Sequence, residues 1–270
     1  MTILIILLCL GLNAFTPVGR WARQYNWLGH YFTYHQKWLG TTPFGKGVLG
    51  LFMALMPAVI VVAILQWMMF YFTWGIADFI FEALILLYAL GVMPQVEKSS
   101  VKKAKAVPNP TIEEAARGQI VVLTSEDKHG ILWQAQTNIF AVLFWFIVLG
   151  PAGAVLYRFS RLLSEQTYVE GSPQIRQSAE CWISYLDWLP VRLLGICLVL
   201  AGRFESAFKV WWGQIGTSPK DNAVYLEACG HAALEHGQDN PSTQWSLFQR
   251  ALSILLIVLV IITLTARMHS

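Results

Sequence analysis

Long uncharged apolar stretches alternate with shorter polar ones along this chain. The clearest is Val48–Phe70, because no charged side chain lies between Lys46 and Asp78. As a helix rising about 1.5 Å per residue, it is long enough to span the roughly 30 Å hydrocarbon core of a bilayer. A short aromatic link leads from it to a second apolar stretch, Ile76–Met93. The pattern predicts a tight helical hairpin within a membrane.

Apolar stretches also lie near both ends. Ile3–Phe15 lacks a basic region before it and a small-residue cleavage site after it, so it predicts a retained first helix and not a signal peptide. Ala251–Ala266, bracketed by Arg250 and Arg267, predicts a short C-terminal span.

For two further stretches the sequence does not decide whether the chain crosses the membrane. Ile131–Tyr157 is uncharged but interrupted at Gly150 and Pro151, so it either spans with a kink or enters and returns. Leu189–Gly202 is shorter than the roughly 20 residues of a straight crossing, which predicts a helix that dips into the bilayer or lies tilted. Pro190 is expected in the first turn of that helix, where its missing N–H costs nothing.

Composition confirms the class that the pattern indicates. Apolar residues make up 56% of the 270 residues and charged residues only 13%, against about 25% charged in soluble proteins. The fold class we predict is all-α: a polytopic helical membrane bundle over 1–270 as a single domain, with four to six membrane segments, some of them re-entrant. The net charge of +3 is too small to indicate a nucleic-acid partner. The four cysteines stand singly, which predicts neither a disulfide nor a metal cluster.

Lysine and arginine placement predicts the orientation. The segment 94–130 is rich in lysine and is expected to form a cytoplasmic loop and helix. The segment 203–250 is expected to be a second cytoplasmic loop with two short helices. The uncharged turn at 71–75 and the N-terminus are placed outside. The aromatic and basic segment 16–40 is either an interfacial helix or a helix packed on the bundle.

The polar residues of most interest are Arg158, Asp187, Arg192 and Glu205, because each adjoins or interrupts an apolar stretch where a charge is costly. Arginine is the usual partner of a planar oxyanion, so this set is suited to a phosphate or carboxylate ligand. The alternative is an internal salt-bridge network that fixes helix packing. In either case we expect Arg192 to pair with Asp187, Glu205 or another acid.

Glu82 is a further candidate ligand-binding residue. It lies four residues after Asp78, on the same face of the second hairpin helix, and paired carboxylates can bind a cation or exchange protons. Asp78 alone is better explained as the polar end of the span. The two histidine pairs are each spaced five residues apart, which does not bring both rings to one helical face. No catalytic residue, metal site or cofactor is therefore assigned.

Several motifs resemble the AmpE family of inner-membrane proteins, which is associated with β-lactamase induction and with sensing of peptidoglycan recycling. They are Ile131–Trp133, Leu143–Ile147 and Leu186–Gly195, followed by Gly202, Glu205, Ala207 and Trp211. The resemblance implies a multi-pass protein of the bacterial inner membrane that signals and is not an enzyme. Its expected partners are membrane lipid, an anionic cell-wall fragment or lipid phosphate, and further copies of itself or other inner-membrane proteins.

AmpE is similar in turn to the CbiB/CobD membrane synthases of cobalamin synthesis, which makes an ATP-dependent amide-forming synthase the alternative function. The acidic signatures of that family are replaced here. Trp133, Gln134, Thr137 and Asn138 stand before the Phe-Trp block, and 161–164 reads Arg-Leu-Leu-Ser. Because ATP-dependent ligation needs carboxylates to hold Mg²⁺ against phosphates, these departures favour the signalling function. No inverted repeat is visible to indicate a transporter.

Overall fold

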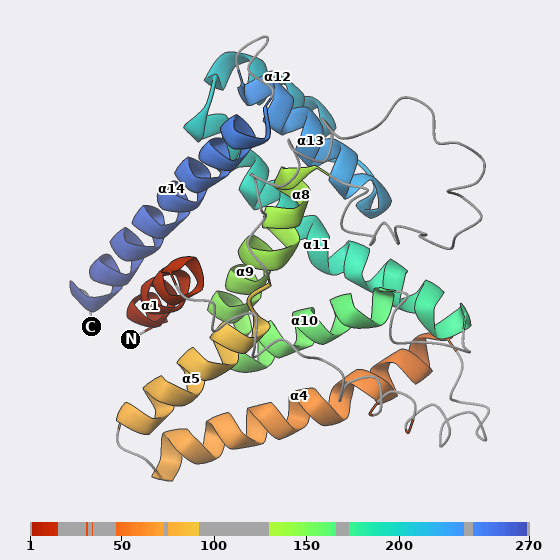
Figure 1. Cartoon of the computed structure of the whole chain (residues 1–270), viewed down its shortest axis with the longest axis vertical. Helices are drawn as coiled ribbons and strands as arrows, with labels where there is room; N and C mark the ends of the chain where they lie inside the picture. The colour runs from red at the N-terminus through yellow and green to blue at the C-terminus, as the bar shows by residue number, and fades with distance from the viewer. Residues whose placement is uncertain are drawn as a thin grey trace, which may run out of the picture.

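The computed structural model describes residues 2–15, 31, 34, 47–72, 75–91, 130–165, 173–234 and 240–268 (Figure 1). Almost all of the predicted cytoplasmic segment 94–130 lies outside the described residues, as does the aromatic segment 16–40 except for two tyrosines. Within the described ranges the chain forms helices and no strand. The prediction of an all-α fold is confirmed.

The hairpin is formed by α4 (Gly47–Phe72) and α5 (Ile76–Ala89), within two residues of the predicted start and end of the first helix. Pro57 lies inside α4. The two helices are joined by a short connection and diverge away from it in Figure 1. Helix α1 (Thr2–Phe15) packs against α5, where the Cys9 thiol donates to the Ala83 carbonyl at 3.3 Å.

A continuous helical segment follows at 131–149, made of α8 (Ile131–Ala135), the π-helix η3 (Gln136–Phe140) and α9 (Ala141–Leu149). It ends at Gly150, whose φ of 69° lies in the left-handed region that favours glycine. Pro151 is then the first residue of α10 (Pro151–Ser164), which takes a new direction (Figure 1). The predicted break at Gly150 and Pro151 is confirmed.

The central helix is α11, which runs from Pro173 to Ala201 and contacts α4, α10, α12, α13 and α14. The expectation of a short helix beginning near Leu189 is therefore wrong, and so is the placement of Pro190 in a first turn, because Pro190 lies inside α11. The helix continues through Asp187 because that carboxylate is buried against α10, so a polar residue here does not mark the end of the apolar segment.

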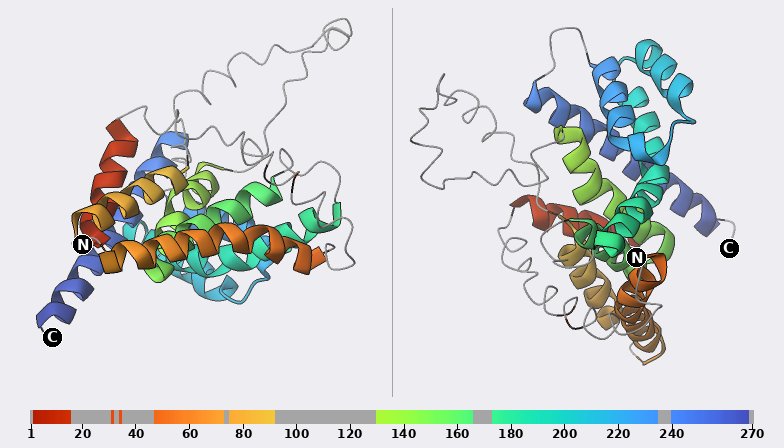
Figure 2. Two further views of the ribbon diagram at one scale, coloured as in Figure 1. Left: turned by 90° about the horizontal axis from the view of Figure 1, so that it is seen from below. Right: turned by 90° about the vertical axis from the view of Figure 1, so that its right-hand side faces the viewer.

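The C-terminal third contains α12 (Phe204–Gln214), a short 3₁₀ turn η4 (Pro219–Asp221), α13 (Asn222–Ala233) and α14 (Pro241–Met268). Helix α14 begins well before the predicted start at Ala251, because 241–250 carries buried Leu247 and Phe248 that pack on the core. Its C-terminal end projects beyond the other helices (Figure 2).

Four helical segments of the described chain are long and apolar enough to cross a membrane: Val48–Met69, Ile131–Leu149, Ile175–Ala201 and Pro241–Ala266. Helix α14 exposes a run of apolar side chains near its C-terminal end, including Ile257, Ile261 and Ile262. Exposed apolar surface of this kind suits contact with lipid. The protein is a helical membrane protein.

Candidate functional site

Buried polar side chains gather around the middle of α11. The described residues of this kind are Gln136, Thr137, Asn138, Arg158, Ser160, Asp187, Arg192 and Asn222. We call these residues the polar core. They come from η3, α10, α11 and the start of α13, helices that are distant in sequence. Burying a polar side chain is costly unless it has a hydrogen-bond partner. The contacts of these residues therefore show which of them are held by the protein and which could bind a ligand.

Asp187 is the centre of one half of the polar core, and its side chain is only 1% exposed. The Tyr157 hydroxyl donates to its Oδ1 at 2.7 Å. Nη1 of Arg161 lies 3.6 Å from its Oδ2. Tyr157 and Arg161 are four residues apart and therefore share one face of α10. Both oxygens of this carboxylate are thus engaged from a single helix.

The π-helix η3 forms the other wall of this half. Nη1 of Arg158 donates to Oδ1 of Asn138 at 3.3 Å. The Gln136 amide is fully buried beside the Asp187 carboxylate and makes no hydrogen bond of standard geometry to a described residue. A π-turn rearranges helical hydrogen bonding and is frequently found at functional sites. Here the polar run 136–138 lies within it.

The end of α5 closes against the same π-helix. The backbone N–H of Gly91 donates to the Asn138 carbonyl at 2.8 Å. A Cβ at position 91 would overlap the Asn138 side chain, so only glycine fits this close approach. The backbone of η3 therefore bonds to the residue segment that follows α5, while its side chains also reach Arg158 of α10 and lie beside Asp187 of α11.

Arg192 forms the second half of the polar core, and its expected pairing with an acid is wrong. Its Nε donates to the Ile215 carbonyl at 3.1 Å, and its Nη1 donates to Oδ1 of Asn222 at 2.7 Å. Its Nη2 donates to the carbonyl and hydroxyl oxygens of Thr217 at 2.9 and 2.8 Å. Asp187 lies five residues earlier, about 140° away around the helix, so the two side chains face different neighbours.

Aromatic rings complete the surroundings of Arg192. Its guanidinium carbon lies 5.1 Å from the ring centroid of Trp188 and 4.2 Å from that of Tyr225. Asn222 in turn donates to the Ser184 carbonyl at 2.8 Å. Arg192 thus ties α11 to the start of α13 and to the connection before it. Its donors are already occupied by protein acceptors, which is the geometry of a structural arginine; a ligand role for it stays a prediction.

The remaining predicted site residues lie elsewhere. The side chain of Glu205 is 87% exposed and pairs with Lys209 on α12 at 3.1 Å. Glu82 and Asp78 line a cavity of about 240 Å³ between α4 and α5 with Gln66. The structure therefore brings Arg158 and Asp187 into one half of the polar core, places Arg192 in the other half, and leaves Glu205 and Glu82 outside the core. In the described part of the chain, no three His, Cys, Asp or Glu residues are grouped to hold a metal ion.

Sequence reasoning missed Tyr157, Arg161 and Asn222 as members of the site. A signal for the first two was present, because four-residue spacing after the glycine and proline break places them on one helical face. The polar run 136–138 within an uncharged helix was a second signal. Asn222 gave none, since its role depends on the fold of the connection between α12 and α13.

These features define a class: an all-α membrane protein with buried polar side chains gathered around its central helix, α11. Residues 1–268 match the family described as regulatory signalling modulator protein AmpE, and the chain belongs to this family. No solved structure matches.

Three curated relatives share parts of the sequence. The "Cobalamin biosynthesis protein CobD" of Stutzerimonas stutzeri is 28% identical over 57% of this chain and 55% of its own length. A protein of the same name from Chromobacterium violaceum is 32% identical over 38% of this chain and 34% of its own. "Protein AmpE" of Shigella flexneri is 31% identical over 34% of each. The matches cover less than two thirds of each relative.

Proposed function

We propose that this protein is a non-catalytic signalling modulator of the bacterial inner membrane, which links peptidoglycan recycling to β-lactamase induction. Membership of the AmpE family and the match to the Shigella protein support the proposal. The structural observation that carries it is the engagement of Asp187, the one buried carboxylate of the described residues, by both Tyr157 and Arg161.

This arrangement suits the sensing of an anion better than the holding of Mg²⁺. A magnesium nucleotide needs carboxylates that are free to coordinate the metal. Asp187 is instead bound to α10. Arg161 lies at the edge of the core, with its side chain 20% exposed, and divides its charge between Asp187 and Glu165.

An anionic ligand could therefore change the contact between α10 and α11 by binding Arg161. A cell-wall fragment or a lipid phosphate that binds Arg161 competes with Asp187 for the guanidinium. Arg158, one residue after Tyr157, is the second cation on this part of α10. Loss of the Arg161 contact weakens the connection between α10 and α11. Ligand binding is thus coupled to the packing of the central helix.

The test uses a strain that lacks the gene and has an inducible β-lactamase. Arg161→Gln combined with Arg158→Gln is expected to abolish inducibility at wild-type protein level. Arg176→Gln is the matched control, because Arg176 lies on α11 in an exposed pair with Glu180. Normal inducibility in the double variant would contradict the proposal.

The CobD relatives favour a second function, a membrane-bound ATP-dependent amide-forming synthase. Nucleotide binding by the purified protein separates the two. Tight ATP binding that depends on Mg²⁺ would support the synthase. The signalling function predicts no such dependence.

A further inference from the structure

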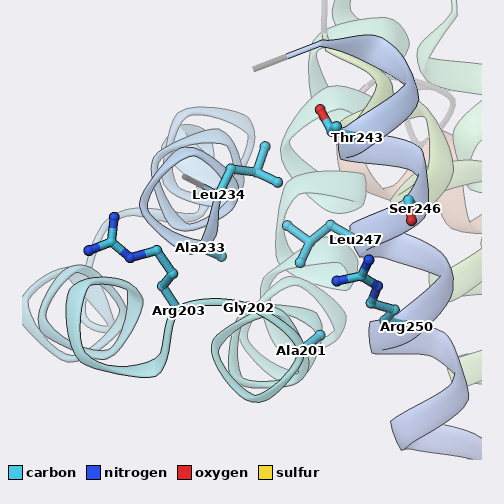
Figure 3. Close-up of a pocket in the computed structure, with 9 residues that line it drawn as sticks. All are labelled: Ala201, Gly202, Arg203, Ala233, Leu234, Thr243, Ser246, Leu247 and Arg250. Carbon is cyan, nitrogen blue, oxygen red and sulfur yellow. The ribbon is translucent and has the colours of Figure 1, made fainter. Parts of the chain in front are cut away.

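A pocket of about 320 Å³ lies where α11 and α13 end beside the first turns of α14 (Figure 3). Helix α14 lines it with Thr243, Ser246, Leu247 and Arg250, whose spacing places them on one helical face. The opposite wall consists of 201–203 and 233–234. The lining of the whole pocket therefore combines arginine, hydroxyl and leucine side chains.

Two arginines flank this pocket, Arg250 on α14 and Arg203 in the connection between α11 and α12. Figure 3 shows Arg250 reaching from α14 toward the ends of α11 and α13, and Arg203 on the opposite wall with its guanidinium turned away. Both residues are exposed, and no carboxylate of the described residues pairs with either. Arg203 is thus able to turn into the pocket without breaking an ion pair to a described residue. Helix dipoles do not explain the two cations, because Arg203 follows the end of α11 but is also the N-cap of α12, and Arg250 lies inside α14.

Both arginines lie at the boundary of apolar segments. Arg203 follows the membrane-length segment of α11, which ends at Ala201. Arg250 lies inside the membrane-length segment Pro241–Ala266 of α14, directly before its uncharged part 251–266, which exposes Ile257 and Ile261. Lipid phosphates lie at this level of a bilayer, just beyond the hydrocarbon core.

Helix α12 adds an independent observation beside the pocket. Its exposed aromatic residues Phe204, Phe208 and Trp212 are spaced four apart and form one stripe. The ring centroids of Phe204 and Phe208 are 5.4 Å apart, and those of Phe208 and Trp212 are 6.2 Å apart. Exposed aromatic stripes of this kind are typical of helices that lie at the surface of a membrane.

We propose that this pocket binds the phosphate of an anionic phospholipid while the aromatic stripe of α12 rests in the headgroup region. Arg203 and Arg250 supply the charge, and the Ser246 hydroxyl is placed on the same wall as Arg250 to donate to a phosphate oxygen. Leu234 and Leu247 provide apolar contact for the glycerol and upper acyl carbons. The pocket is separate from the polar core, so the lipid proposal does not depend on the signalling proposal.

The experiment measures lipid binding to the purified full-length protein in detergent by native mass spectrometry. Phosphatidylglycerol is the anionic probe, phosphatidylcholine the zwitterionic one, and glycerol 1-phosphate the soluble one. The wild-type protein is expected to retain phosphatidylglycerol in preference to the other two. Arg203→Gln with Arg250→Gln is expected to weaken that retention about tenfold or more, since each basic residue near an anionic surface contributes to the attraction.

Control variants separate the pocket from general charge effects. Arg176→Gln removes one exposed arginine elsewhere on α11 and should leave retention unchanged. Arg203→Lys with Arg250→Lys keeps both charges and should restore most of the binding. Equal retention by wild-type protein and the glutamine variant would overturn the proposal. Glycerol 1-phosphate binding as tightly as phosphatidylglycerol would assign the pocket to a soluble phosphate and overturn the lipid assignment.

Discussion

The Tyr157 hydroxyl and the Asp187 carboxylate form a buried hydrogen bond of 2.7 Å that joins α10 to α11. Neither group is accessible to water, so the tyrosine hydroxyl depends on Asp187 as its acceptor, whereas Asp187 is also paired with Arg161. The pair holds together two helices that the sequence separates by a polar connection.

Removing either partner should destabilise the protein. We expect Tyr157→Phe to cost about 0.5–2 kcal/mol and Asp187→Ala about 2–4 kcal/mol, because the second change leaves the tyrosine hydroxyl unpaired. SDS titration of the purified protein measures both. The exposed Glu205 and Lys209 pair is the control, and Glu205→Ala should cost less than about 0.5 kcal/mol. A double variant that simply adds the two single effects would show that the residues are not coupled.

Arg192→Gln should impair folding and not ligand binding alone. The glutamine cannot reach the acceptors at Ile215, Thr217 and Asn222 together, so the buried Asn222 oxygen and the half-buried oxygens of Ile215 and Thr217 lose their partner. We expect a lower thermal unfolding temperature in detergent and less protein in membranes. A variant with wild-type stability that has lost signalling would instead support a ligand role for Arg192.

The four cysteines should differ in reactivity. Cys181 is exposed, whereas Cys9, Cys197 and Cys229 are buried. Burial raises the pKa of the Cys229 thiol on α13 to about 11. Its thiolate fraction therefore stays small at pH 8, and raising the pH to 9 should not make it react. Mass spectrometry after brief treatment of the folded protein with N-ethylmaleimide should find Cys181 modified first. Early modification of Cys229 would contradict its burial.

The orientation predicted from lysine and arginine placement has a direct test. If 203–250 is cytoplasmic and α14 crosses once, the C-terminus lies outside. Alkaline phosphatase fused after Ser270 should then be active, and the same enzyme fused within 94–130 should not. The opposite pattern of activity would reverse the assigned orientation.

Helix α4 could be predicted from the sequence because no charged side chain interrupts it. Helix α11 could not, because Asp187 and Arg192 look like the boundary of an apolar segment when each residue is judged by its own hydropathy. Their cost is offset by partners on α10, on α13 and in the connection at 215–217, which a linear pattern does not contain. The same reason explains the wrong pairing of Arg192 with an acid. Charge alone suggested a carboxylate, whereas the fold supplies carbonyl and amide oxygens.

The π-helix η3 sets the relative rotation of the two ends of segment 131–149. A π-turn contains one residue more than an α-turn, and each residue of an α-helix turns the chain by about 100°. A regular α-helix with the same number of residues would instead rotate α8 against α9 by about that angle. Leu132, now buried against Gly230 of α13, would then point toward a different neighbour. The length of this segment is therefore under tighter constraint than its hydrophobicity, and insertions or deletions there should be tolerated less well than apolar substitutions.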